Sequence, residues 1–427
     1  MDINNISNFN SNSNRNGNGN DQCKNNDNYN YNNDDTDNAD IMIPELNFNE
    51  IHKLHDIKRN IDIKRNDDFI KSSIITPDGS HISTITESNS IQLWKINDYF
   101  INSYRYYKNK LNDNDNNNND KIMNEVIDIN VGETVFDLSW YPYANIVDPL
   151  TYCYVTTSRD HPIHLWDALT GKIRCSYVGF NHVDEVDAVN SLSFNLTGDK
   201  LYTGSNRMIR CFDVANPGSN CRNIPTCRTR KDPLGQKGII SCINFCPDNS
   251  GAFAAGSYAY SVGIYVENMD GCALELRELE SAVTCLRWSK DGNNLWVGGR
   301  NSSNISCWDV RNTRSEIGKI HRDLKSNQRI TFDLDPWGKY LATGSQDGNL
   351  MIYDTKSFEL IQSKKISANC VNSCSFHPFS SIVAASIGQR HFNINDNDSD
   401  DDDNDDENIN TQSSLELYNF GCNPVCI

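Results

Sequence analysis

The sequence predicts an all-β fold, a seven-bladed β-propeller. One strand pattern recurs seven times, and each copy contains a Pro/Asp/Gly turn, a strand of small residues and a strand that ends in an aromatic residue. The distance from turn to aromatic is 16–18 residues in five of the seven copies. Seven such copies can close into a ring that leaves no exposed sheet edge.

The copies can be aligned on their turns and their aromatic residues. In chain order, the turn residues are Pro77, Pro142, Leu196, Pro247, Lys290, Pro336 and Pro378, and the aromatic residues are Trp94, Trp166, Phe212, Tyr265, Trp308, Tyr353 and Tyr418. The second and seventh copies are longer because "NIVDPLT" and an acidic run lengthen their loops. Trp166-Asp167 and Trp308-Asp309 are typical of WD40 repeats, so we expect a WD40 β-propeller.

The propeller is expected to span residues 41–422, with residues 41–68 supplying the outer strand of the last blade. Residues 1–40 are Asn-rich and too poor in apolar residues to fold, so they are predicted to form a disordered tail. Segments 112–120 and 395–412 are predicted disordered loop insertions, and 423–427 a short C-terminal tail. The acidic insertion is interpreted as a solvated loop, with binding to a basic protein as the alternative.

Charge and cysteine usage narrow the class of protein. The net charge is −18, but residues 393–412 and 1–68 carry most of it, so the body is close to neutral. No apolar run reaches 18 residues, which predicts no membrane association. The fifteen cysteines are expected to be free thiols of a reducing compartment. The pairs Cys242/Cys246 and Cys370/Cys374 are predicted to pack in the core.

Catalytic chemistry is not predicted. The sequence has no Walker loop, no GxSxG elbow and no HExxH motif, so we expect neither an enzyme nor a cofactor or metal. The pair Cys422/Cys426 is more open than the other two, but its spacing also argues against zinc. His182 is expected to join a structural hydrogen-bond network with Ser158, Asp160 and Trp166.

A candidate binding face follows from the placement of cations. In a propeller, the loops between second and third strands share one ring end with the loops that lead into the innermost strands. The predicted residues of that end are Arg159, Arg207, Lys237, Tyr258, Arg300, Gln328, Arg329, Gln389 and Arg390. Arginine binds phosphate and stacks on bases, and amides bond base edges. We therefore predict binding of a single-stranded RNA loop, with pairing of individual arginines to Asp160, Asp184 or Asp347 as the alternative.

Several segments resemble the telomerase Cajal body protein family. They are "HPIHLWDALTGKIR", "FNHVDEV", "KGIISCINFCPD", "GSYAYSVGIY", "CWDVRNT", "SNQRITFDLDPWGKYLATGSQDG" and "ASIGQR" before an acidic insertion. The likeness runs in collinear order from Phe69 to Phe420 and includes the long second copy. The resemblance implies a non-catalytic RNA-binding scaffold. We expect it to be a monomer. Its implied ligand is a short box in the terminal loop of small Cajal-body RNAs, and of telomerase RNA where that RNA carries the box.

The resemblance also implies that the protein directs the ribonucleoprotein to nuclear Cajal bodies or telomeres, with ribonucleoprotein core proteins as partners. The cytoplasm is a second expected location. "NQR" (327–329) and "GQR" (388–390) fall within the quoted segments, and Arg159 falls within the collinear stretch from Phe69 to Phe420. A second functional class, a substrate receptor of a ubiquitin ligase, remains an alternative. Trp308-Asp309-Val310-Arg311 reads WDxR, a motif with which substrate receptors of cullin ubiquitin ligases bind their adaptor.

Overall fold

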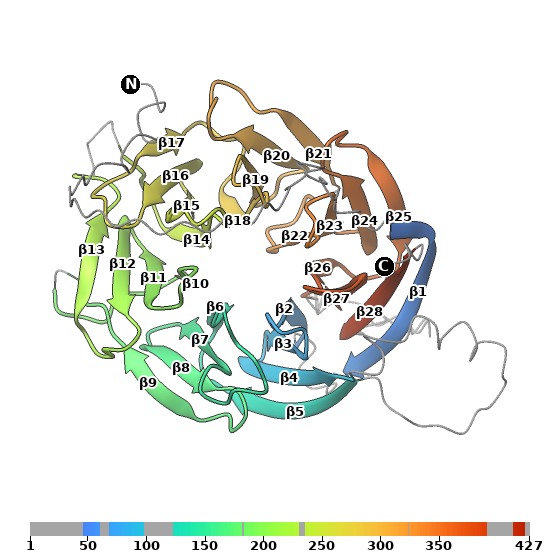
Figure 1. The fold of residues 1–427 in the computed structure, drawn as a ribbon, viewed down its shortest axis with the longest axis horizontal. Coiled ribbons are helices and arrows are strands. Elements are labelled where there is room, and N and C mark those ends of the chain that lie inside the picture. The colour runs from blue at the N-terminus through green and yellow to red at the C-terminus, as the bar shows by residue number, and fades with distance from the viewer. Residues whose placement is uncertain are drawn as a thin grey trace, which may run out of the picture. The chain divides into compact units, whose positions relative to one another are not determined.

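The computed structural model describes residues 46–59, 68–97, 123–181, 183–229, 235–322, 324–390 and 413–422. Within these ranges the chain forms seven four-stranded antiparallel sheets arranged as the blades of one ring (Figure 1). The predicted seven-bladed propeller is therefore confirmed. The predicted disordered segments 1–40, 112–120 and 395–412, the tail 423–427 and the side chain of His182 lie outside the described residues.

The strands of each blade are called a to d, from the central channel outward. Blade 1 is β2 (Ile70–Ile75), β3 (His81–Thr86), β4 (Ser90–Ile96) and β5 (Met123–Asn130). Blade 2 is β6 (Val135–Trp140), β7 (Cys153–Ser158), β8 (Ile163–Asp167) and β9 (Ile173–Tyr177). Blade 3 is β10 (Ser191–Phe194), β11 (Lys200–Ser205), β12 (Met208–Asp213) and β13 (Cys221–Pro225). Blade 4 is β14 (Ile240–Phe245), β15 (Ala252–Ser257), β16 (Ser261–Val266) and β17 (Leu274–Leu276).

The last three blades follow in the same order. Blade 5 is β18 (Val283–Trp288), β19 (Asn294–Gly299), β20 (Asn304–Asp309) and β21 (Gly318–His321). Blade 6 is β22 (Phe332–Leu334), β23 (Tyr340–Gly344), β24 (Asn349–Asp354) and β25 (Leu360–Lys365). Blade 7 is β26 (Val371–Phe376), β27 (Ile382–Ile387) and β28 (Ser413–Cys422), completed by β1 (Leu46–Arg59).

The repeat residues occupy the same place in every blade. Each aligned aromatic residue lies on a c strand, and each aligned turn residue lies between strands a and b. The Trp94 indole donates to Thr84 Oγ1 at 3.1 Å, and the Trp166 indole donates to Thr156 Oγ1 at 2.8 Å. The Trp166 indole therefore donates to Thr156, while the expected network of His182 with Ser158, Asp160 and Trp166 stays a prediction because His182 lies outside the described residues.

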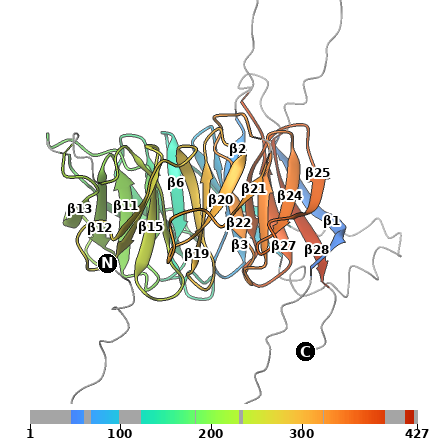
Figure 2. The same cartoon turned by 90° about the horizontal axis from the view of Figure 1, so that it is seen from above.

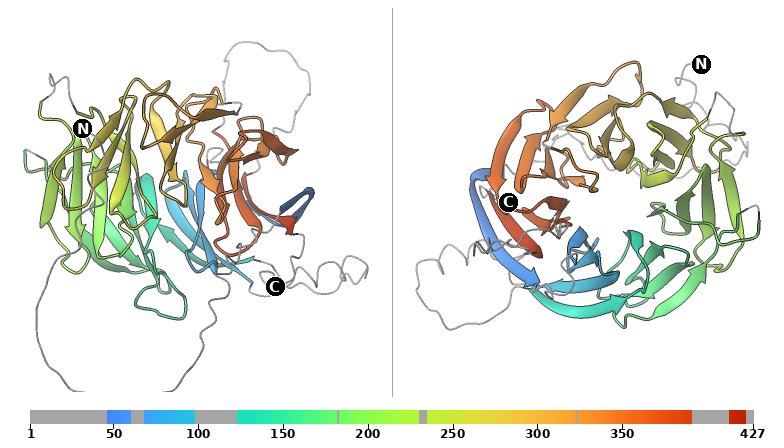
Figure 3. Two further views of the ribbon diagram at one scale, coloured as in Figure 1. Left: turned by 45° about the horizontal axis from the view of Figure 1, so that its top comes forward. Right: turned by 180° about the vertical axis from the view of Figure 1, so that it is seen from behind.

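The hydrophobic core lies between the blades. The seven larger clusters of buried residues each combine side chains of two neighbouring blades. Figure 3 shows the blades side by side around the ring. Between blades 1 and 2, for example, Leu93 packs with Tyr154 and Trp140, and the Trp140 indole donates to Ser83 Oγ at 3.0 Å. A blade therefore buries its apolar faces only when both neighbours are present.

Small residues in the b strands allow neighbouring blades to approach closely. Gly204, Gly256 and Gly344 occupy equivalent positions near the ends of their b strands. A Cβ atom on Gly204 would lie 2.6 Å from the Ile240 side chain, and one on Gly344 would lie 2.1 Å from the Val371 carbonyl oxygen. The small-residue strands predicted from the sequence thus fit the space left by the innermost strand of the next blade.

Side chains join neighbouring a strands around the channel. The Asp137 carboxylate accepts from the Leu192 N–H at 2.9 Å, and the Asp333 carboxylate accepts from the Phe376 N–H at 3.0 Å. The Ser373 hydroxyl oxygen accepts from the Ser73 N–H at 2.8 Å. These bonds satisfy backbone donors that have no neighbouring strand in the same sheet.

The ring closes where the two ends of the propeller meet. β1 pairs with β28 in antiparallel register, from Leu46 opposite Cys422 to Arg59 opposite Ser413. The expectation that residues 41–68 supply the outer strand of the last blade is confirmed. Glu416 on β28 is 4% exposed. Its carboxylate accepts from Lys53 Nζ on β1 at 2.6 Å and from the Tyr418 hydroxyl.

Replacing Lys53 tests this closure. Lys53→Met leaves the buried Glu416 carboxylate without its ammonium partner, so we expect the free energy of unfolding to fall by about 1–3 kcal/mol. Lys53→Met with Glu416→Gln should recover part of the loss, because a buried amide costs less than an unpaired carboxylate. Urea unfolding measures both, with Lys172→Met as the exposed control. A double variant less stable than the single one would contradict the role of this pair.

Candidate functional site

The two ends of the ring carry different connections. Because the strands alternate in direction, all b–c connections share one end with the segments that enter strands a (Figure 2). Backbone bonds join the two sets: the N–H of Arg159 donates to Thr134 O, that of Arg207 to Gly238 O and that of Arg300 to Ala282 O. This b–c end therefore contains all nine residues predicted from the sequence.

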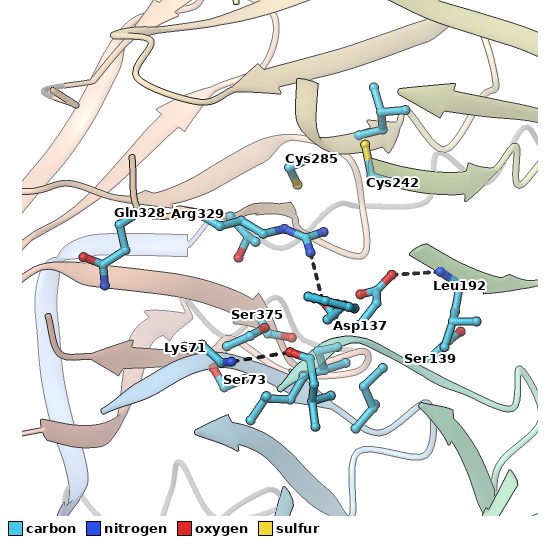
Figure 4. Close-up of a pocket in the computed structure, with 18 of the residues that line it drawn as sticks. Lys71, Ser73, Asp137, Ser139, Leu192, Cys242, Cys285, Gln328, Arg329 and Ser375 are labelled. Atoms are coloured by element: carbon cyan, nitrogen blue, oxygen red, sulfur yellow. Dashed lines mark hydrogen bonds between the residues drawn. The ribbon is translucent and has the colours of Figure 1, made fainter. Parts of the chain in front are cut away.

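A cavity of about 740 Å³ occupies the channel and its mouth at the b–c end (Figure 4). Four of the predicted residues line it: Arg300, Gln328, Arg329 and Arg390. The charged residues of its wall are Lys71, Glu87, Asp137, Arg287, Arg300, Arg329 and Arg390. Five cations against two carboxylates give this cavity a positive balance, which favours an anionic ligand.

Arg329 reaches across the channel. The segment before β22 carries it, and its guanidinium donates to the Thr284 carbonyl in blade 5 at 3.2 Å and to the Phe136 carbonyl in blade 2 at 3.4 Å. Figure 4 shows the guanidinium directed toward Asp137. Burial raises the pKa of Asp137 above its usual range, and the charge of Arg329 and the Leu192 N–H oppose this rise. Arg329 is therefore both a structural bridge and the central cation of the cavity.

Arg390 has a partner at the channel mouth. Its guanidinium is ion-paired with Glu87, and Glu87 also lies 3.3 Å from Lys71 Nζ. Burial lowers the pKa of Lys71 in spite of this carboxylate. The partner of Arg390 is thus Glu87, not one of the three aspartates considered from the sequence. Half of the Arg390 side chain remains exposed, so the pair can open toward a ligand.

The two glutamines differ in environment. The Gln328 amide donates to Asn372 Oδ1 at 2.6 Å and to the Gly388 carbonyl at 3.0 Å. It therefore fixes the segment before β22 to the b–c connection of blade 7 and has little freedom to contact a ligand. Gln389 is half-buried beside this contact and does not line the cavity.

The remaining predicted residues lie beside the cavity on blades 2 to 4, next to Arg300 on blade 5. Arg159, Lys237 and Arg300 are exposed, while Arg207 and Tyr258 are half-buried. The Arg300 guanidinium lies over the Tyr258 ring, 4.9 Å from its centre. Within the described part of the chain, no carboxylate forms an ion pair with the four cations Arg159, Arg207, Lys237 and Arg300.

Sequence reasoning missed the charged residues of the innermost strands. Lys71 lies on β2, Asp137 on β6 and Arg287 on β18, and all three line the cavity. Arg287 Nε donates to Asp333 at 2.9 Å. A usable signal was present, because a charged residue in an otherwise uncharged a strand, as in "VFDLSW" or "VTCLRW", is costly to bury unpaired and therefore favours a place beside the channel or beside a partner.

The predicted core cysteines are confirmed. Cys242 and Cys246 belong to the cluster between blades 4 and 5, Cys374 to the one between blades 6 and 7, and Cys370 packs with Leu324 and Ile330. Burial raises the pKa of Cys242 to about 12. Among the described residues, no group of three His, Cys, Asp or Glu side chains could hold a metal ion, and no helix could span a membrane.

The WDxR motif lies at the opposite end of the ring. Arg311 donates to the Asp309 carboxylate through Nε and Nη2, both within 2.9 Å. The Arg311 side chain is 63% exposed. The motif is thus accessible, although the guanidinium already has a carboxylate partner.

These features define the class of protein: a WD40 β-propeller with a cationic channel mouth. The family model "WD domain, G-beta repeat" matches residues 174–213, and the model "Eukaryotic translation initiation factor eIF2A" matches residues 250–396. Telomerase Cajal body protein 1 of Bos taurus is 34% identical over 337 residues, which cover 77% of this chain and 59% of that protein. The chain belongs to the telomerase Cajal body protein family.

Two further relatives come from other organisms. The telomerase Cajal body protein 1 homolog of Drosophila melanogaster is 33% identical over 278 residues, or 64% of this chain and 49% of that protein. Guanine nucleotide-binding protein negative regulator 1 of Schizosaccharomyces pombe is 31% identical over 311 residues, or 70% of this chain and 74% of that protein. The chain thus matches only about half to three-fifths of the length of the Cajal body proteins.

Replacing Arg329 tests its bridging role. Arg329→Met leaves two carbonyls without their donor and Asp137 without the opposing charge, so we expect a loss of about 1–3 kcal/mol in the free energy of unfolding. The pKa of Asp137 is higher in the folded chain than in the unfolded chain, so the folded chain holds this proton more tightly. The free energy of unfolding therefore falls as the pH rises above about 4, the ordinary pKa of an aspartate. Arg329→Met should steepen this fall.

Urea unfolding between pH 4 and 7 measures the effect, with exposed Arg159→Met as the matched control. Adding Asp137→Asn to Arg329→Met should remove the extra pH dependence, because the residue then no longer titrates. If Arg329→Met matched the parent protein in both stability and pH profile, the contacts of Arg329 would contribute nothing to the stability of the ring.

Proposed function

We propose that the chain is a non-enzymatic RNA-binding scaffold and that its b–c end binds a single-stranded RNA loop. The observation that carries this proposal is the gathering of Arg159, Arg207, Lys237 and Arg300 at one ring end, free of ion pairs within the described residues, around a cavity with a positive balance. Cations without carboxylate partners are available to phosphates without a prior ion pair being broken.

The shape of this end favours a loop over a duplex. A ring of short connections is too broad to enter the major groove of DNA, whereas unpaired bases of an RNA loop can turn toward a flat surface. Arg300 over the Tyr258 ring offers a stacking surface for such a base. The cavity between Arg329 and Arg390 can take a phosphate or a base that points inward.

The relatives' names support a particular setting for this activity. Telomerase Cajal body protein 1 is named for telomerase and for Cajal bodies, which are nuclear. We propose that this chain binds small Cajal-body RNAs, and telomerase RNA where it carries the same loop sequence, and acts in the nucleus. Core proteins of the same ribonucleoprotein are the expected protein partners, and a single copy of the propeller suffices for the proposed RNA site.

A double substitution of exposed arginines tests the RNA site. Arg159→Ala with Arg300→Ala should weaken binding of a small stem-loop RNA more than tenfold, because each lost charge-assisted contact costs about 1.5–3 kcal/mol. The salt dependence of binding should become shallower, since fewer counterions are released. Both side chains are exposed, so the melting temperature should stay unchanged. Fluorescence anisotropy against salt concentration measures affinity and slope together.

The matched control lies at the opposite end of the ring. Arg314 and Lys356 are exposed residues of c–d connections, so Arg314→Ala with Lys356→Ala removes the same charge and should leave RNA binding intact. Loss of RNA binding in this control alone would place the RNA elsewhere. If immunoprecipitation recovered ubiquitin-ligase subunits and no RNA, the WDxR motif would define the function instead.

A further inference from the structure

The outer side of the ring has a further cavity, of about 280 Å³, where blade 4 meets blade 5. Its wall comes mainly from the segment between β17 and β18, from one face of β20 and from the connection between β20 and β21. β17 (Leu274–Leu276) has three residues, fewer than any other outermost strand that the structure describes. The cavity therefore lies where the outer edge of blade 4 ends early, beside the neighbouring strand β20.

Trp308 on β20 lines this cavity, and it differs from the other six repeat aromatic residues. Those six are 8% exposed or less, whereas Trp308 is half-buried. In blades 1 and 2 the repeat tryptophan donates to a threonine of strand b, Thr84 or Thr156. The strand register puts Val297 at this place in blade 5, so the Trp308 indole donates to Ser306 Oγ at 2.9 Å instead. An aromatic residue that is buried in the other blades is thus available to a ligand here.

The charged residues of the cavity wall are three carboxylates and one cation: Glu278, Glu280, Glu316 and Lys319. Lys319 is ion-paired with Glu280, and its Nζ lies 2.9 Å from the Glu316 carboxylate. Hydrogen bonds from Lys319 and Asn304 lower the pKa of Glu280, so this carboxylate is ionised at neutral pH. The wall therefore has an excess of negative charge, and the contacts of Lys319 show that its carboxylates accept a cation.

Glu278 is the wall carboxylate that has no counter-charge. Among the described residues, no cation forms an ion pair with it. The preceding Arg277 is bonded to the Glu275 carboxylate, and exposed Arg314 does not line the cavity. The backbone of Glu278 has a φ of 56°, in the left-handed region, which is costly for a residue with a side chain. A strained and unpaired glutamate at the edge of a cavity favours a site that a positively charged group completes.

We propose that this cavity binds an arginine side chain of a partner protein. A guanidinium can stack on Trp308, pair with Glu278 and donate to the wall hydroxyls of Ser281, Ser302, Ser306 and Ser315. The carboxylates of the wall repel phosphate, which argues against RNA and anionic lipid. Pockets for whole small molecules usually measure about 300–1,000 Å³, so this smaller cavity suits a single side chain. The inference does not depend on the proposed function.

Fluorine NMR of the full chain labelled with 5-fluorotryptophan tests this proposal, with Trp308→Phe to assign the Trp308 resonance. The probe is the peptide acetyl-Gly-Arg-Gly-amide, and the control peptide carries citrulline, which has nearly the same shape without the charge. We expect the arginine peptide to shift the Trp308 resonance to saturation and to leave the resonances of buried Trp94 and Trp166 in place. The citrulline peptide should bind at least about tenfold more weakly, because it loses the charge-assisted bonds and the cation–π contact.

Glu278→Gln should lower the affinity for the arginine peptide at least about threefold, because it removes the unpaired carboxylate. Glu359→Gln is the matched control: it removes the same charge from an exposed connection of blade 6 and should leave the affinity unchanged. Neither exposed substitution should change the melting temperature. The proposal fails if the Trp308 resonance does not move, if the citrulline peptide binds as tightly, or if Glu278→Gln has no more effect than Glu359→Gln.

Discussion

The pairing of β1 with β28 is the contact on which the remaining structure depends. It joins strands from opposite ends of the chain and gives the last blade its fourth strand. Because the hydrophobic core lies between blades, every blade needs two neighbours, and only a closed ring provides them. The bond between Lys53 and buried Glu416 reinforces this closure, and bonds such as Asp137 to Leu192 join neighbouring a strands.

A closed ring also fixes the positions of the connections at its two ends. At the b–c end, cations from several blades surround one cavity, although they are spread over the sequence from Lys71 to Arg390. Arg329 inside the channel supports the ring, while Arg159 and Arg300 at its rim face solvent. A ligand at this end would therefore meet unpaired cations first and the structural cation last. The opposite end holds the a–b turns and the c–d connections, where aspartates such as Asp148 and Asp291 lie in the same connections as cations such as Lys172 and Lys290 or in neighbouring ones.

The repeat chemistry explains what the sequence could predict. The blade count, the aromatic c-strand positions and the closing strand all follow from local patterns that recur in each copy. The partners of individual cations could not be predicted in the same way. Arg390 pairs with Glu87, 303 residues away, and Arg329 bonds Phe136, 193 residues away. These contacts depend on how the blades meet across the channel, which no single repeat encodes.

Binding of RNA at the b–c end can be measured most directly by ultraviolet crosslinking in cells, with sequencing of the bound RNA and identification of the crosslinked peptides. We expect small RNAs with crosslinks in their terminal loops, joined to peptides that contain Tyr258, Arg300 or the segment around Arg329. Absence of RNA above an unirradiated control, or crosslinks confined to the other end of the ring, would contradict this account.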